Sequence, residues 1–187
     1  MSNLNIITGT MFSGKTSYLI KKAKKLSLNK KIIFISHKFD LIRSNKNKIY
    51  TNDNKKQKLK FVNIVFVDDL SNISIKNYDI IFIDEFQFFN FSKEIILNWL
   101  NEYPNKIFYI SGLNINWKME KWGSILDLIP YSSNIKILYS NCFSCLKNNK
   151  KEKAIFTIKN SNNNTDIEIG SNNIYETLCF NCYQKRK

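Results

Sequence analysis

Asn3–Thr16, with the sequence NLNIITGTMFSGKT, joins a short apolar run to a loop that contains two glycines, and apolar residues at helical spacing follow it. The last eight residues fit G-x-x-x-x-G-K-[ST] between a strand and a helix, which is the context that a phosphate-binding loop requires. Gly9 and Gly14 allow the tight turns that point successive N–H groups at phosphate oxygens. The sequence therefore predicts a nucleotide-binding α/β protein.

The loop residues are the first candidates for nucleotide contacts: Gly9, Thr10, Met11, Phe12, Ser13, Gly14, Lys15 and Thr16. Lys15 is expected to reach the β- and γ-phosphates, and the Thr16 hydroxyl is expected to bind Mg²⁺. The positive end of the following helix adds to the attraction for phosphate. A chance match is the alternative, but the two glycines, the Lys-Thr pair and the flanking elements together argue against it.

Lys31–Ser36 is a near-continuous apolar run, which predicts a strand that is buried on both faces. Tyr78–Glu85 is predicted as a further buried strand, and Phe61–Val67, Lys106–Gly112 and Asn134–Tyr139 are also predicted as strands. Helical spacing predicts helices at Gly14–Leu28, at Ser92–Leu100 with Ser92 as N-cap, and at Gly123–Leu128 with Pro130 ending it. This order predicts a parallel sheet with helices on both faces. The basic segment His37–Lys60 has almost no periodicity and is expected to be a loop or partly disordered.

Two adjacent carboxylates, Asp84 and Glu85, end the third predicted strand. An acidic residue there in a phosphate-loop protein commonly holds Mg²⁺, so Asp84 is the expected metal-side carboxylate. Glu85 is then available as a base toward an attacking hydroxyl or water. The alternative is a solvated pair that only caps the loop. His37, the single histidine, is interpreted as a polar residue just past a strand end.

Two Cys-x-x-Cys pairs, Cys142 with Cys145 and Cys179 with Cys182, mark a change of character after residue 139. Four thiolates at this spacing suit tetrahedral Zn²⁺ in a structural site. Redox chemistry or two unconnected thiol pairs is the alternative. Between the pairs, Ala154–Lys159 and Asp166–Gly170 are expected to form two strands around an Asn-rich turn. The predicted organisation is residues 1–139 as a nucleotide-binding unit and 140–187 as a small zinc-binding unit.

Composition limits the class of protein. The chain of 187 residues has a formal net charge of +14 and four cysteines. It has neither an apolar stretch of membrane-spanning length nor a secretory signal pattern, so a soluble protein in a reducing, cytoplasmic compartment is expected. The excess charge is spread as Lys through a sequence rich in Asn, Ile and Phe, which favours a solvated basic surface. Nucleic acid is therefore an unexpected partner, and so is a membrane.

The motifs together resemble a known family. Gly9–Thr16 resembles the G-P-M-F-S-G-K-[ST] loop of the cellular-type (type II) thymidine kinases, and Ile83–Phe89 resembles their I-D-E-x-Q-F-F. Leu113–Gly123 resembles their L-D-x-x-F-x-x-x-P-F-G segment. Ile169–Tyr175, followed by Cys179-x-x-Cys182, resembles their I-G-G-x-x-x-Y-x-x-x-C-x-x-C ending. The resemblance runs from about Asn5 to Tyr183 and is weakest from Asp40 to Lys76.

This resemblance implies transfer of the γ-phosphoryl of ATP to the 5′-hydroxyl of thymidine. It implies a RecA-like P-loop domain plus a zinc-ribbon domain with a lasso loop, usually as a homotetramer. Glu85 would be the catalytic base, and Gln87 would belong to the same nucleotide-contacting motif as Asp84. The implied thymidine contacts are Met11, Phe88, Leu113, Trp117, Tyr175 and the lasso residues Asp166, Ile167, Glu168, Ile169 and Gly170.

Several departures from the family pattern keep other readings open. Asn114 replaces an Asp, Ser171 replaces a Gly, and Trp117 and Trp122 replace Phe. A D-x-R motif after the second strand is present only as the longer Asp40–Arg43, so a phosphate role for Arg43 is in doubt. The rival functions are a nucleic-acid-binding zinc-ribbon ATPase and a nucleotide-binding protein that has lost catalysis.

Overall fold

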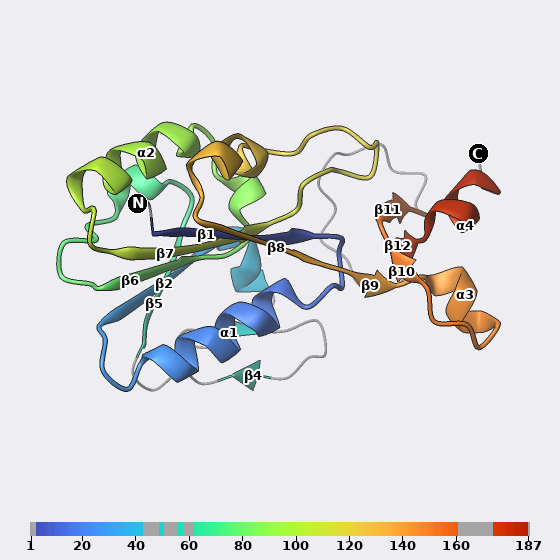
Figure 1. Ribbon diagram of the computed structural model, residues 1–187, viewed down its shortest axis with the longest axis horizontal. Helices are drawn as coiled ribbons and strands as arrows, with labels where there is room; N and C mark the ends of the chain where they lie inside the picture. The colour runs from blue at the N-terminus through green and yellow to red at the C-terminus, as the bar shows by residue number, and fades with distance from the viewer. Residues whose placement is uncertain (1–2, 43–48, 51–55, 58–61, 161–173, 187) are drawn as a thin grey trace.

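A computed structural model describes residues 3–42, 49–50, 56–57, 62–160 and 174–186, and its centre is a six-stranded parallel sheet. The strand order is β5-β2-β6-β7-β1-β8 (Figure 1). The strands are β1 (Leu4–Gly9), β2 (Ile32–His37), β5 (Val62–Val67), β6 (Ile80–Ile83), β7 (Ile107–Gly112) and β8 (Asn134–Leu138). The strand predicted before the phosphate loop and the five predicted between this loop and the cysteine-rich segment are all present, so the predicted α/β class is confirmed.

Helices cover both faces of this sheet, as expected. α1 (Lys15–Leu26) packs on one face, where Leu19, Ile20 and Ala23 meet the apolar side chains of β2, β6 and β7. α2 (Ser92–Glu102) and the 3₁₀ helix η4 (Ile125–Tyr131) cover the other face and enclose the larger apolar cluster (Figure 1). Right-handed crossovers of this kind bring the carboxyl ends of the strands to one edge of the sheet.

Three local predictions are wrong in detail. The helix at 92 takes Phe91 as its N-cap, in the left-handed region, and the Ser92 hydroxyl donates to the Phe89 carbonyl instead. Pro130 lies inside the short 3₁₀ helix η4, one residue before its end at Tyr131, and does not end the helix. β6 stops at Ile83, so Asp84 and Glu85 follow the strand and are free to turn their side chains into the site.

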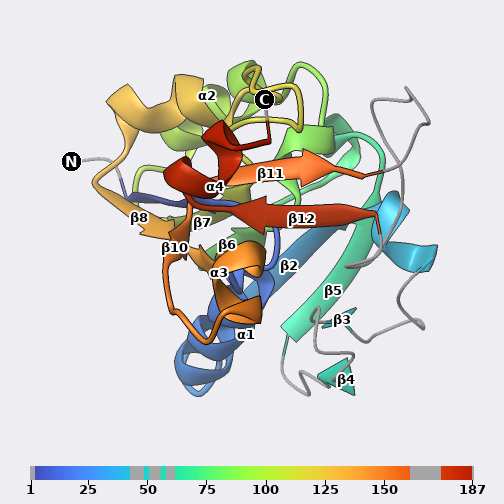
Figure 2. The same ribbon diagram turned by 90° about the vertical axis from the view of Figure 1, so that its right-hand side faces the viewer.

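The cysteine-rich segment, residues 140–160 and 174–186, lies beyond the carboxyl ends of the strands (Figures 1 and 2). It contains β9 (Ser140–Asn141), α3 (Phe143–Lys147), β10 (Lys153–Ala154), β11 (Phe156–Lys159), β12 (Tyr175–Leu178) and α4 (Phe180–Gln184). β10 pairs with β9, and β11 pairs with β12, both antiparallel. The predicted strand Ala154–Lys159 is thus divided at Ile155 between two partners. The other predicted strand, Asp166–Gly170, lies outside the described residues.

The basic segment after β2 is not wholly irregular. It begins with the 3₁₀ helix η1 (Lys38–Ile42) and contains a short antiparallel pair, β3 (Ile49–Tyr50) with β4 (Lys56–Gln57). Arg43 lies outside the described residues. Further short 3₁₀ helices are η2 (Leu70–Asn72) and η3 (Phe86–Phe88). Among the described helices, none combines the length and the apolar character that crossing a bilayer would need.

Candidate active site

The phosphate loop, residues 9–16, connects β1 to α1 at the carboxyl edge of the sheet. Gly9 has φ +140°, and a Cβ there would lie 1.9 Å from the Leu138 carbonyl oxygen, so β8 leaves room only for glycine. Phe12 and Gly14 are both left-handed, with φ of 59° and 84°. Alternation of left- and right-handed residues points successive N–H groups into one concave surface, which is how backbone binds anions.

Lys15 is buried at the first position of α1, and its Nζ donates to the carbonyl oxygens of Thr10 (2.7 Å) and Gly9 (3.3 Å). Burial lowers the pKa of Lys15, while the negative charges of Glu85 and Asp84 act to raise it. The ammonium therefore lies at the loop, within electrostatic reach of both carboxylates. This is the place that a cation facing a triphosphate would occupy.

Asp84 is almost completely buried, between the phosphate loop and the end of β7. Its Oδ1 accepts hydrogen bonds from the Ser111 hydroxyl and from the Glu85 N–H, and the Thr16 hydroxyl also bonds to this carboxylate. Burial and the nearby Glu85 raise the pKa of Asp84 to about 6, against the effect of these hydrogen bonds.

The second carboxylate oxygen of Asp84, Oδ2, is buried and has no partner among the described residues. A buried oxygen of this kind is costly unless something pairs with it. A divalent cation beside the Thr16 hydroxyl would pair with it, and oxygen donors are those that Mg²⁺ prefers. The donor set therefore fits the predicted magnesium site.

Glu85 has a left-handed backbone, with φ 53° and ψ 42°, and its side chain is half-buried. Its Oε2 accepts a hydrogen bond of 2.6 Å from Gln87 Nε2, and Gln87 Oε1 in turn accepts one of 3.0 Å from the Leu113 N–H. Gly123 closes over this pair, because a Cβ there would lie 2.7 Å from the Gln87 Cα. A non-glycine residue in this strained conformation is often found at functional sites.

Three of the residues predicted to contact the nucleoside lie in three different places. Leu113 is buried directly after β7, and Trp117 is half-buried on the loop formed by residues 113–123. Tyr175 is buried at the start of β12, where it pairs with Lys159 across the ladder. The Trp117 ring lies under two ammonium groups, with Lys118 Nζ at 5.3 Å and Lys159 Nζ at 5.5 Å from its centroid. The Trp117 indole nitrogen is buried and has no hydrogen-bond partner within the described part of the chain.

Phe88 lies in an aromatic cluster. Its ring is 5.3 Å from Phe39, 5.3 Å from Trp122 and 5.5 Å from His37 between centroids. Burial lowers the pKa of His37, so the neutral ring is favoured inside this cluster. His37 is therefore a packing residue next to the site; it is the buried last residue of β2, and not a polar residue just past the strand end as interpreted from the sequence. The lasso residues 166–170 lie outside the described residues.

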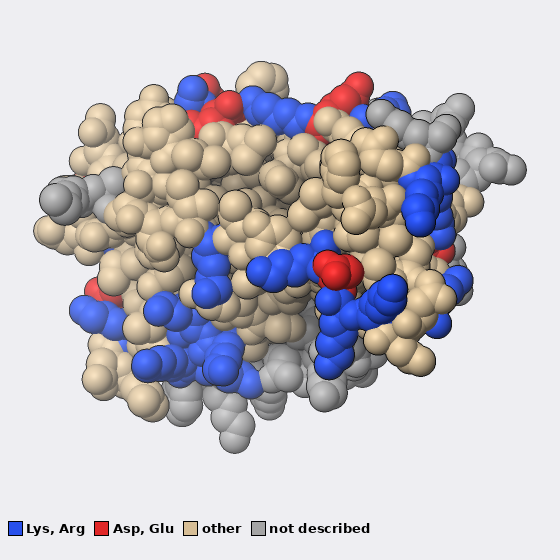
Figure 3. Space-filling view, turned by 45° about the vertical axis from the view of Figure 1, so that its right-hand side comes forward, with Lys and Arg blue, Asp and Glu red and all other residues tan. Residues whose placement is uncertain are grey.

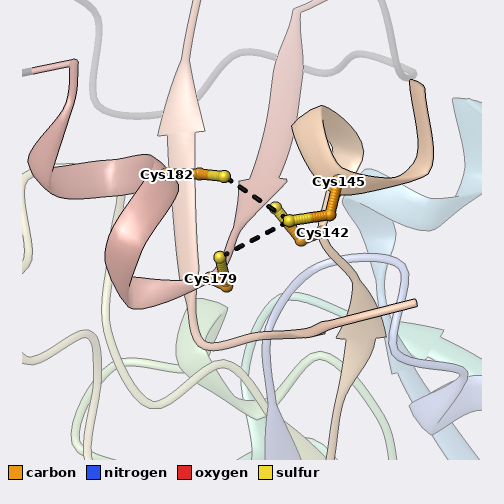
Figure 4. A group of neighbouring side chains, drawn as sticks. All are labelled: Cys142, Cys145, Cys179 and Cys182. Atoms are coloured by element: carbon orange, nitrogen blue, oxygen red, sulfur yellow. Dashed lines mark hydrogen bonds between the residues drawn. The ribbon is translucent and has the colours of Figure 1, made fainter. Parts of the chain in front are cut away.

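The four cysteines converge from the ends of two short helices (Figure 4). Their sulfur atoms all lie within 4.8 Å of one another, with Cys145 Sγ 3.5 Å from Cys182 Sγ and 3.8 Å from Cys179 Sγ. A tetrahedral zinc with Zn–S bonds of ~2.3 Å requires sulfurs about 3.8 Å apart, so the set fits that ion. Burial acts to raise the pKa of the Cys142 thiol, but hydrogen bonds from the Cys179 and Cys145 backbone lower it to about 7. The pKa of Cys145 is instead raised to about 12, first by its hydrogen bond with Cys182, so without a metal only Cys142 of these two favours the thiolate form.

Sequence reasoning missed three polar residues that complete this region. Ser111 bonds to Asp84, Ser140 bonds to Thr10, and Thr157 accepts from the Met11 N–H. Each is a buried hydroxyl residue in or beside a strand. The only signal available was their position near strand ends, which many Ser and Thr residues share.

The basic side chains on the face shown in Figure 3 form several groups separated by uncharged surface, with few acidic groups among them. Among the described residues, four lysines lie over tyrosine rings: Lys22 over Tyr109, Lys106 over Tyr103, Lys136 over Tyr18, and Lys153 over Tyr139. These contacts use the lysines to cover aromatic surface.

A family model described as thymidine kinase matches residues 2–183. The thymidine kinase of Amsacta moorei entomopoxvirus is 36% identical over 186 residues, covering 97% of each chain. That of African swine fever virus (isolate Tick/South Africa/Pretoriuskop Pr4/1996) is 30% identical over 190 residues, covering 97% of this chain and 93% of its own. That of Mycoplasma mobile is 30% identical over 183 residues, covering 96% of this chain and 86% of its own. The family model matches nearly the full length of the chain, and the phosphate loop, Asp84 and Glu85 are grouped at one edge of the sheet. The chain therefore belongs to the thymidine kinase family.

Proposed function

We propose that this chain transfers the γ-phosphoryl group of ATP to the 5′-hydroxyl of thymidine, giving dTMP for DNA precursor synthesis. Membership of the thymidine kinase family supports ATP and thymidine as the two substrates. The observation that carries the proposal is the grouping of Lys15, Thr16, Asp84 and Glu85 around one concave loop. Phosphoryl transfer needs little more than such positioning and charge stabilisation.

Each of these side chains has a proposed task. The backbone N–H groups of the phosphate loop and the Lys15 ammonium bind the β- and γ-phosphates. Thr16 and Asp84 would hold Mg²⁺, which would supply positive charge to the phosphates. Glu85 accepts the proton of the 5′-hydroxyl as that oxygen bonds to the γ-phosphorus, and the bond to the β–γ bridging oxygen breaks to release ADP. The hydrogen bond from Gln87 fixes the direction of the Glu85 carboxylate.

Thymidine then occupies the space beside Met11, Leu113 and Trp117, with Phe88, Tyr175 and the lasso residues 166–170 completing the proposed contacts. The buried indole N–H of Trp117 has no partner among the residues that the structure describes, which supports this placement, because a nucleoside oxygen would give it an acceptor. The family pattern has Phe at this position, which offers no such donor. A Trp here therefore adds a polar contact to what would otherwise be an apolar wall.

Two units cooperate in this proposal. Residues 1–139 form the P-loop kinase unit, and residues 140–187 form the unit that carries the lasso and a structural Zn²⁺ held by the four cysteines. The free state of these four cysteines suits a reducing, cytoplasmic compartment.

The assembly expected for this enzyme is a homotetramer, and the free edge of the sheet supports contact between copies there. β8 is the edge strand, and its Ile135 and Ile137 are 42% and 52% exposed. Pairing β8 with its own symmetry copy would place these side chains opposite one another and satisfy the open backbone groups. Light scattering on Ile137→Lys tests this: a smaller assembly than wild type is expected, and an unchanged mass would exclude this edge.

A coupled kinase assay with ATP and each of the four deoxynucleosides tests the proposed reaction. We expect ADP release that depends on thymidine and on Mg²⁺. ATP hydrolysis that is stimulated by single-stranded nucleic acid and insensitive to nucleosides would instead favour the zinc-ribbon ATPase. Binding of ATP and thymidine without turnover would identify a protein that has lost catalysis.

A further inference from the structure

The cysteine-rich segment is hydrogen-bonded directly to the phosphate loop. The Met11 N–H donates to the Thr157 hydroxyl of β11 across 3.2 Å. Beside it, the Thr10 and Ser140 hydroxyls are 3.0 Å apart, and the Ser140 N–H donates to Thr10 Oγ1 at 3.4 Å. Thr157 and Thr10 are 4% and 5% exposed, so water offers little competition for these bonds.

The Thr157 contact falls at a sensitive point of the loop. Met11 directly precedes Phe12, whose φ of 59° sets the turn that aims the following N–H groups. A hydroxyl that holds the Met11 N–H toward β11 fixes the Thr10–Met11 peptide plane, which lies one residue before the plane that leads into Phe12. Loss of the hydroxyl leaves a part-buried donor without this partner and lets the Thr10–Met11 plane rotate.

The same face of β11 also contacts the 113–123 loop. Lys159 is two residues beyond Thr157 and therefore on the same side of the strand. Its Nζ lies 5.5 Å from the centroid of the Trp117 ring. One strand of the cysteine-rich segment thus contacts both the phosphate loop and the loop proposed to line the nucleoside.

We propose that Thr157 is a positioning residue that couples the β11–β12 pair to the phosphate loop. When the nucleoside side of the site is ordered, the hydroxyl of Thr157 holds Met11 in the orientation that presents the remaining N–H groups to the triphosphate. Thr157 itself touches neither reacting group. The assignment rests on the proposed function only for the identity of the nucleoside, because the contact to the phosphate loop is independent of it.

The neighbouring strand offers a matched control. Thr177 is the direct cross-strand partner of Thr157 in the β11–β12 ladder and is 5% exposed. Its hydroxyl donates to the Asn141 carbonyl (3.1 Å), so it remains within the cysteine-rich segment. Replacing either threonine by valine removes one buried hydroxyl from the same ladder, but only Thr157→Val removes a bond to the phosphate loop.

The experiment measures KM for ATP, KM for thymidine and kcat for Thr157→Val, Thr157→Ser and Thr177→Val. We expect Thr157→Val to raise KM for ATP about fivefold, the effect of losing one buried hydrogen bond. Thr157→Ser should restore KM for ATP to within about twofold of wild type, because it keeps the hydroxyl. Thr177→Val should leave KM for ATP within the same range. Equal effects of the two valine variants, or a wild-type KM for ATP in Thr157→Val, would overturn the proposal.

Calorimetric titration with a non-hydrolysable ATP analogue, with and without thymidine, gives a readout that needs no turnover. In wild type, thymidine should tighten analogue binding, and Thr157→Val should reduce that gain about fivefold. If the protein proves to act on another nucleoside, the analogue titration without nucleoside still compares the variants. Thr157→Ala is the second variant if the valine side chain lowers zinc content, and wild-type affinity of both for the analogue would refute the coupling.

Discussion

The phosphate-loop edge of the sheet and the cysteine-rich segment are stabilised in different ways. The sheet places the loop between two large apolar clusters, one on each face. The buried members of the cysteine-rich cluster are only Cys142, Ala154, Leu178 and Cys179, two of which are proposed metal ligands. A core this small does not stabilise a fold alone, whereas a metal can.

The contrast separates two requirements of the site. Buried charge and backbone strain, at Lys15, Asp84 and Glu85, are found where the core is large enough to hold them. The part proposed to cover the nucleoside is built on the less stable segment, which is where moving elements are generally found. Variants should therefore fail differently: those of the charged residues on the sheet side in turnover, and those of the metal ligands on the cysteine side in nucleoside affinity.

Lys15→Ala should give the largest effect and tests the sheet side. We expect turnover to fall on the order of 10³-fold. Within the part of the chain that the structure describes, Lys15 carries the only buried ammonium at the loop, and this variant removes it. The melting temperature should be unchanged or higher, since burial already disfavours the charge. Kinetics and thermal denaturation measure both effects. Lys21→Ala, an exposed lysine of the same helix, is the control and should behave as wild type.

Glu85→Gln sharpens the comparison by removing the proposed base alone. Turnover should fall about 100-fold while the affinity for thymidine survives, because an amide keeps the shape but cannot accept the proton. Glu94→Gln changes an exposed carboxylate in the first turn of α2 and serves as the control. Stopped-flow kinetics and equilibrium binding separate the two quantities, and a wild-type rate would mean that the base is elsewhere.

Removing the metal should destabilise the cysteine-rich segment and leave the central sheet folded. Chelation, or Cys179→Ser, is expected to raise KM for thymidine about tenfold, since loss even of a residue that only orients a metal ligand commonly costs about 10–100-fold in metal affinity or activity. Hydrogen exchange should show lost protection in β11 and β12 and retained protection in β1 and β7. Metal analysis that finds no zinc in the purified protein, or uniform loss of protection, would contradict the division.

In the magnesium-free protein, where the proposed metal-binding role of Asp84 plays no part, Asp84→Asn should give the smallest of these effects, a change in stability that depends on pH. The folded pKa of Asp84 is about 6, above its ordinary value of 3.8, so the folded protein keeps a proton that the unfolded chain releases. The stability of the magnesium-free protein should therefore fall as pH rises from about 4 to about 6. The Asn variant lacks this dependence and should melt a few degrees higher above pH 6. Parallel melting curves at all pH values would refute the raised pKa.

Local motifs made much of this protein predictable from its sequence. The phosphate loop, the Asp84-Glu85 pair and the two Cys-x-x-Cys pairs each fit within eight residues, so their chemistry and spacing can be read directly. The apolar runs likewise predicted the strands, because a buried parallel strand has few alternatives. Strand and helix ends were less certain, as Ser92 and Pro130 illustrate, since capping depends on backbone angles that the sequence does not fix.

Contacts between distant residues could not be predicted in this way. Ser111 is 27 residues from Asp84, Ser140 is 130 residues from Thr10, and Thr157 is 146 residues from Met11. Only the path of the chain brings these hydroxyls to the site, and no local spacing records it. The left-handed turn at Glu85 is equally invisible, because nothing in the residue itself favours that conformation.

The three tryptophans of the chain lie in three different surroundings. Trp99 is in the core, Trp122 packs edge-on against Phe88, and Trp117 lies beneath two lysine ammonium groups at the proposed thymidine site. Indole emission depends on nearby charge, so a chain keeping only Trp117, through Trp99→Phe and Trp122→Phe, would report ligand arrival by its own fluorescence. The protein thus carries an intrinsic optical probe with which the order of substrate addition can be followed without a label.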